Sequence, residues 1–142
     1  MARYNTRIIN IVSNIEENLP LLICDKRRIL QVISNLISNS IKYSKDNTTI
    51  EVTGKIIKNK MEIKIIDQGI GMNEQEIPIA LSTYGTIHNV DYSSTGSYGL
   101  GLPIVKMLLD VHDAKLSIES SKGKGTTVKI IFPAYKLIYN KN

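Results

Sequence analysis

Apolar residues recur along the chain with two spacings, which distinguish the segments that form strands from those that form helices. Residues 49–57 and 61–66 alternate apolar and polar positions, the period expected of strands with one buried face. Asn59 and Lys60 separate these two segments and predict a hairpin. Four further segments are predicted as strands: residues 5–15, 21–24 (an edge strand), 115–119 and 126–132.

Apolar residues three and four positions apart predict two amphipathic helices. Asp25 is the expected N-cap of the first. Its apolar stripe comprises Ile29, Leu30, Val32, Ile33, Leu36, Ile37 and Ile41. The second runs from about Leu100 to Val111, and a short helix is expected near residues 74–81. The fold class is therefore α+β, a two-layer α/β sandwich with a mixed sheet covered on one face by helices. We expect one domain over residues 1–142, with a frayed tail at 136–142.

Composition and charge narrow the class of protein. Of the 142 residues 42% are hydrophobic, as in globular domains, and the single cysteine suits a reducing compartment. No stretch approaches the roughly 20 apolar residues that span a bilayer, so we expect a soluble, cytoplasmic chain without membrane contact. The net charge of +5 is scattered along the sequence, which favours an anionic small ligand over a nucleic-acid surface.

Asn35 and Asn39 lie four positions apart on the first predicted helix, so their amides project from the same side. An amide oxygen is a hard ligand suited to Mg²⁺, which also takes water and phosphate oxygens. Lys42 and Tyr43 follow and could approach such phosphates. The competing interpretation is a solvated polar helix face.

Asp67 directly follows a predicted strand and opens the sequence Asp-x-Gly-x-Gly, with Gly69 and Gly71. A carboxylate at a strand end can accept a hydrogen bond from an exocyclic amine, and glycines let the backbone approach a flat ring. Taken alone, this pattern is also a common turn.

A second glycine-rich stretch, residues 96–103, opens the later helix with Gly99 and Gly101. Backbone amides at a helix N-terminus bind phosphate well, and Pro103 is tolerated in the first turn. No Gly-x-x-x-x-Gly-Lys-Ser/Thr loop occurs in the chain, and the stretch lacks the third glycine of a dinucleotide-binding fold.

The order of these motifs, ending with Gly123-Lys124-Gly125-Thr126, resembles the ATPase catalytic domain of sensor histidine kinases. That domain belongs to the superfamily shared with gyrase, MutL and the heat-shock chaperone ATPases. The resemblance covers residues 5–133, and residues 31–44 are especially similar to the kinase branch.

The resemblance implies a role for each matching residue. Asn39 would bind Mg²⁺, and Asp67 would hold the adenine amine, with Thr126 completing the adenine pocket. The remaining nucleotide-binding positions would be Lys42, Tyr43, Gly69, Gly71, Gly99, Leu100, Gly101 and Leu102. Residues 73–98 would form a mobile lid over the ATP.

Asn35 and Lys42 are the candidate catalytic residues. Relatives that hydrolyse ATP, and the anti-sigma serine kinases, carry a glutamate general base where Asn35 stands. An amide is not basic, whereas an imidazole acceptor is itself nucleophilic, so the asparagine favours phosphoryl transfer to histidine.

The resemblance thus implies a protein-histidine kinase domain of a two-component system that uses ATP and Mg²⁺. Its partners would be a helical dimerisation and phosphoacceptor domain absent from this chain and, downstream, a response regulator. The parent kinase could be membrane-anchored. However, no Lys or Arg lies between Asp67 and Val105, so the expected lid carries no cation of these types to contact the phosphates, and its segment 80–86 is neutral. This lid favours one alternative, a nucleotide-binding pseudokinase module. An anti-sigma-type serine kinase, whose helix motif is similar, is the other alternative. His112 is interpreted as a structural residue at a helix end rather than the phosphoacceptor.

Overall fold

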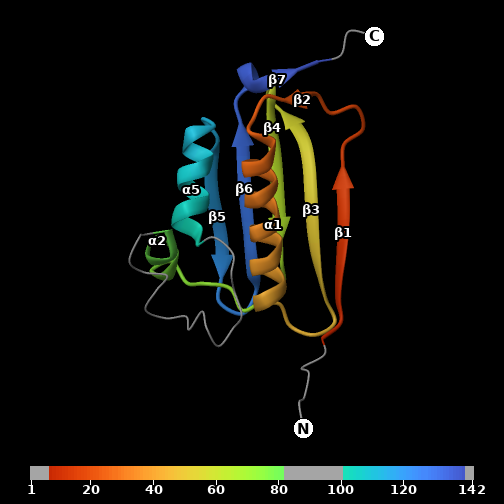
Figure 1. Ribbon diagram of the computed structural model, residues 1–142. Coiled ribbons are helices and arrows are strands. Elements are labelled where there is room, and N and C mark those ends of the chain that lie inside the picture. The colour runs from red at the N-terminus through yellow and green to blue at the C-terminus, as the bar shows by residue number, and fades with distance from the viewer. Residues whose placement is uncertain (1–6, 82–100, 140–142) are drawn as a thin grey trace.

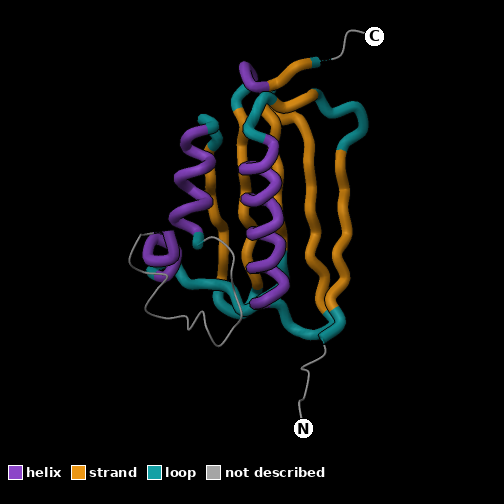
Figure 2. Tube along the Cα trace, viewed as in Figure 1, coloured by secondary structure: helices purple, strands orange, loops and turns teal. Residues whose placement is uncertain are grey.

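A five-stranded mixed sheet forms one layer of the protein, and helices cover one of its faces. The computed structural model describes residues 7–81 and 101–139. The strand order is β1-β3-β4-β6-β5, with β1 parallel to β3 and the other neighbours antiparallel. The strands are β1 (Ile9–Ile15), β3 (Thr48–Ile57), β4 (Lys60–Ile66), β5 (Lys115–Ser121) and β6 (Gly125–Phe132). This arrangement confirms the predicted α+β sandwich (Figures 1 and 2).

Two long helices lie over the sheet, α1 (Lys26–Tyr43) and α5 (Leu102–Val111). Asp25 caps α1 as predicted, since its carboxylate accepts from the Arg28 amide at 3.1 Å. Residue His112 ends α5 and ties it to α1, because its buried Nε2 accepts from the Asp25 amide at 3.0 Å. Within residues 7–81 and 101–139, no helix combines the length and apolar character needed to cross a membrane.

The core lies between the helices and the covered face of the sheet. Ile65 on β4 stands opposite Val52 on β3 and Val128 on β6, so alternate strand residues form continuous apolar rows. Val32 of α1 and Val105 of α5 are fully buried against these rows. The period-two and helical patterns in the sequence thus meet in one core.

The C-terminal segment differs from its prediction. Residues 136–142 were expected to be frayed, but Leu137–Ile138 form strand β7, which pairs with β2 (Leu21–Leu22) in a separate two-stranded sheet. The Ile23 amide also donates to the Lys136 carbonyl at 2.7 Å, and Leu137 is only 9% exposed. The prediction was wrong for residues 136–139, because pairing with a distant segment provides apolar cover and hydrogen-bond partners that local composition does not reveal. Residues 140–142 lie outside the described residues.

The predicted lid and the predicted start of β1 are described only in part. The predicted short helix is α2 (Glu76–Leu81). Residues 82–98 of the proposed lid, 73–98, lie outside the described part of the chain, as do residues 5 and 6 at the predicted start of β1.

Candidate functional site

The Asp67 carboxyl group occupies a fixed position at the end of β4. It is 9% exposed, and its Oδ1 accepts hydrogen bonds from the amides of Gly69 (2.9 Å) and Thr126 (3.0 Å). The Asp67 amide in turn donates to the Thr126 carbonyl at 2.9 Å. Both amides donate to Oδ1. Among the described residues, the second carboxylate oxygen of Asp67 is therefore left to accept a hydrogen bond from a ligand. The carboxylate is therefore held in place before any ligand arrives.

Three chain segments approach one another so closely around Asp67 that only glycine fits at the contacts. A Cβ atom on Gly69 would lie 2.5 Å from the Tyr43 carbonyl oxygen at the end of α1. Gly71 (φ 68°) and Gly125 (φ 100°) have left-handed backbones, and a Cβ would collide with the carbonyl groups of Ser121 and Asp67, respectively. The loop after β4 thus packs against both the end of α1 and the β5–β6 turn.

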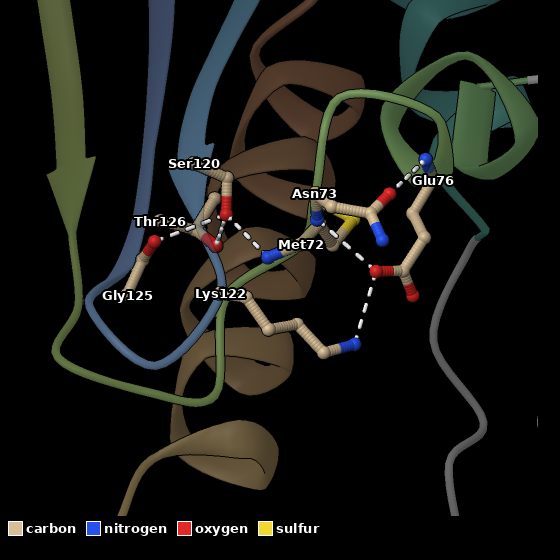
Figure 3. A network of polar contacts seen from close by, with 7 residues as sticks. All are labelled: Met72, Asn73, Glu76, Ser120, Lys122, Gly125 and Thr126. Atoms are coloured by element: carbon tan, nitrogen blue, oxygen red, sulfur yellow. Dashed lines mark hydrogen bonds and ion pairs between the residues drawn. The ribbon is translucent and has the colours of Figure 1, made fainter.

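A hydrogen-bond network connects this loop to the β5–β6 hairpin (Figure 3). The Ser120 hydroxyl lies 2.7 Å from the Thr126 hydroxyl, 3.0 Å from the Gly125 carbonyl oxygen and 2.7 Å from the Met72 amide. Sequence reasoning missed Ser120. The signal was the predicted turn at residues 121–125, because the ladder on either side of it places Ser120 directly opposite Thr126.

The first turn of α2 is joined to the same hairpin. The side chains of Asn73 and Glu76 each accept from the other's backbone amide, a reciprocal capping box. Glu76 also pairs with Lys122 at 3.0 Å. The Asn73 amide hydrogen bond and, secondarily, the Lys122 ammonium hold the pKa of Glu76 below its usual value of 4.5.

Asn35 and Asn39 lie one turn apart on α1, on a side of the helix that is at least partly covered. Asn35 is 5% exposed and Asn39 is half-buried, so a fully solvated polar face is the wrong interpretation for this pair. At the end of the helix, the Lys42 ammonium lies 5.1 Å from the centre of the Tyr43 ring. The described residues contain no group of three His, Cys, Asp or Glu side chains that could hold a metal ion. A divalent cation here would thus need amide, water or phosphate oxygens.

The N-terminus of α5 faces the same end of the molecule. Gly101 is its N-cap in an extended conformation, Pro103 carries no N–H, and the Ile104 and Val105 amides donate to the Gly101 carbonyl (3.0 and 3.1 Å). Among the described residues, the amides of Gly101 and Leu102 are therefore left for a ligand. Gly99 and Leu100 lie outside that part of the chain.

The structure brings most of the sequence-predicted residues together. The C-terminal end of α1, the loop after β4 and the N-terminal end of α5 lie at one end of the molecule (Figure 1). The Asp67, Gly69 and Thr126 groups are in direct contact, and Tyr43 joins them through its carbonyl oxygen, which accepts from the Ile70 amide at 3.3 Å. The described candidate residues therefore gather at one end of the sheet.

Comparisons with known proteins agree with this arrangement. The family model described as "Histidine kinase-, DNA gyrase B-, and HSP90-like ATPase" matches residues 24–136. The cell-division control histidine kinases PdhS of Brucella ovis and Brucella canis are each 30% identical over 149 aligned positions, which cover 94% of this chain. The chain spans 14% of the length of these relatives.

Solved structures show the same fold. The catalytic domain of histidine kinase ThkA has a TM-score of 0.74 at 23% identity, covering 89% of this chain and 79% of that one. The mycobacterial sensor histidine kinase MprB has a TM-score of 0.72 at 25% identity, covering 88% and 81%. Full-length ShkA in complex with AMPPNP has a TM-score of 0.72 at 20% identity, covering 93% and 26%. Because the family model matches residues 24–136, which are most of this chain, the chain belongs to the histidine kinase-, DNA gyrase B- and HSP90-like ATPase family.

Proposed function

We propose that this chain binds Mg-ATP and transfers its γ-phosphate to a histidine on a separate helical dimerisation and phosphoacceptor domain, as part of two-component signal transduction. The single observation that carries the proposal is the Asp67 carboxylate, fixed by two backbone amides among converging glycine-rich segments. Membership of the family and the AMPPNP complex of ShkA support a nucleotide as the ligand.

The base and the phosphates would occupy different parts of the site. The second oxygen of Asp67 would accept from the exocyclic amine of adenine, with Gly69, Gly71 and Thr126 around the ring. The phosphates would extend toward Lys42 and toward the backbone amides of Gly101 and Leu102, where the positive end of the α5 dipole favours negative charge. The proposed nucleotide-binding residues also include Tyr43, Gly99 and Leu100.

The donor groups of the site fit Mg²⁺. The half-buried Asn39 amide supplies one hard, neutral oxygen, and Mg²⁺ normally takes the rest of its shell from water and substrate phosphates. Bound there, the ion would neutralise charge on the phosphates. Asn35, one turn earlier and buried, would keep the region polar without supplying a general base.

Phosphoryl transfer can be tested with radiolabelled ATP and a phosphoacceptor domain from the parent protein. We expect label on the acceptor that is lost in acid and does not form when the acceptor histidine is changed to alanine. Label that survives acid would indicate a hydroxyl acceptor and move the chain to the anti-sigma serine kinases.

A second candidate is a nucleotide-binding pseudokinase module. It is favoured by the absence of Lys and Arg in the sequence between Asp67 and Val105, which leaves fewer cations to neutralise the phosphates. This candidate predicts Mg-ATP binding by calorimetry but no transfer to any acceptor in the same assay.

A further inference from the structure

We propose that Ser120 is a positioning residue that orients the hydroxyl of Thr126 so that this hydroxyl offers only lone pairs to a bound base. This inference rests on the proposed function, because it concerns which purine the same pocket selects. Ser120 lies on β5 and is half-buried, and each of its three polar contacts comes from the loop or hairpin around Asp67.

Only one arrangement of protons makes all three contacts of Ser120 hydrogen bonds at once. A serine hydroxyl has one proton to donate and can accept two hydrogen bonds. The Gly125 carbonyl oxygen, at 3.0 Å, can only accept, so it takes the Ser120 proton. The Met72 amide, at 2.7 Å, can only donate. The remaining contact, at 2.7 Å from the Thr126 hydroxyl, is therefore satisfied only if Thr126 donates to Ser120.

This assignment fixes what Thr126 can offer to a ligand. With its proton directed to Ser120, the Thr126 hydroxyl has only lone pairs left. The backbone of the same residue stands beside the Asp67 carboxylate, since the Thr126 amide donates to Asp67 Oδ1 at 3.0 Å. Where such an acceptor faces the 6-position of a purine, it favours an amine there and disfavours a carbonyl oxygen. Adenine has such an amine, whereas hypoxanthine has an oxygen at the same place.

Removing the Ser120 hydroxyl should change selectivity as well as affinity. In Ser120→Ala the Thr126 proton is released and can turn toward a base carbonyl. The ratio of the ITP to the ATP dissociation constant should then fall about fivefold to tenfold, the effect of one hydrogen bond gained or lost. A loss of packing alone would weaken both nucleotides equally and leave this ratio unchanged.

The experiment measures dissociation constants of Mg-ATP and Mg-ITP by calorimetry for the whole chain and four variants. Ser120→Thr keeps a hydroxyl and should keep the wild-type ratio. Ser117→Ala, an exposed serine on the same strand, is the matched control and should also keep it. If the melting curve shows that Ser120→Ala does not fold, the inference is tested with Thr126→Val and Ser120→Thr instead. Thr126→Val removes the oriented acceptor and should lower the ratio of the ITP to the ATP dissociation constant.

The outcomes separate this inference from the proposed function. An unchanged ratio in Ser120→Ala, or in Thr126→Val, with ATP still bound by the wild type, would overturn the role of Ser120 and leave the nucleotide site intact. A wild type that binds neither nucleotide would overturn both. A lowered ratio in Ser120→Ala, with the ratio preserved in Ser120→Thr and Ser117→Ala, supports the assignment.

Discussion

The two ends of the proposed nucleotide site are built in different ways. At the base end, Asp67 directly follows β4 and Thr126 lies on β6. Hydrogen bonds of 2.9–3.0 Å join the Asp67 carboxylate to two backbone amides and the Asp67 amide to the Thr126 carbonyl. At the phosphate end, Asn39, Lys42 and Gly101 stand on the termini of two helices and are half-buried. The base end is thus organised before binding, whereas the phosphate end would be completed by the ligand and its metal ion.

The largest expected effect is a loss of nucleotide affinity from a change at the base end. Asp67→Asn should weaken binding of a non-hydrolysable ATP analogue about 100-fold, because a charge-assisted hydrogen bond is lost and an amide N–H₂ would face the adenine amine. Calorimetry measures the loss, and an unchanged melting curve shows that the fold survives. The control is Asp110→Asn, an exposed carboxylate on α5 that pairs with Lys106. Near-wild-type affinity in Asp67→Asn would show that the base binds elsewhere.

Substitutions at Gly123 and Gly125, in and next to the β5–β6 turn, test how tightly the base end is packed. Gly125→Ala should lower the free energy of unfolding by about 3 kcal/mol, because left-handed strain adds to a collision with the Asp67 carbonyl. Gly123 has a similar backbone (φ 82°), but among the described residues no atom lies within 4 Å of the place that a Cβ would take. Gly123→Ala should therefore cost only about 1 kcal/mol. Denaturant titration measures both values. Equal losses would mean that close packing at Gly125 contributes nothing.

The phosphate end should depend on magnesium. Asn39→Ala should weaken ATP binding about tenfold when Mg²⁺ is present, because one metal ligand is removed. Without Mg²⁺ its affinity should equal that of the wild type. Calorimetric titrations with and without the ion measure this, and Ser38→Ala, an exposed neighbour on α1, is the control. An equal loss in both conditions would place Asn39 in contact with the nucleotide rather than the metal.

The smallest expected effect concerns the start of α2. The lowered pKa of Glu76 means that its contacts stabilise the fold above the usual value of 4.5 and are lost as the pH falls through the lower, folded-state value. Lys122→Met should raise the pKa of Glu76 only part of the way toward that value, because the Asn73 amide makes the larger contribution. NMR titration of the Glu76 carboxyl measures both. A full return to the usual value would assign the shift to Lys122 instead.

Local sequence patterns predicted the features that depend on near neighbours. Asp25 was identified as a cap, and the β3–β4 hairpin as a hairpin, because caps and turns are specified within a few residues. The strand rows around Ile65 followed from period-two alternation. Features set by distant segments were not predictable in this way. The burial of Leu137 depends on β2, more than a hundred residues earlier in the sequence.

The candidate site also contains residues that local sequence identifies and residues that only the fold reveals. The motif residues could be named from the sequence because glycines at close contacts are distinctive, and Gly69, Gly71 and Gly125 all stand where a Cβ would collide with backbone. Ser120 could not be recognised from residue type, since nothing distinguishes it from Ser117 or Ser121 until the strand register sets it opposite Thr126.

The pairing of β2 with β7 also affects where this domain can be cut. Similarity to the family ends at residue 136, one position before β7 begins. A version shortened to that limit would keep every residue proposed to bind ATP, yet it would lose the partner of Leu21 and Leu22 and uncover one end of the core. Because the match also begins only at residue 24, domain limits taken from family similarity at both ends would remove both strands of this small sheet.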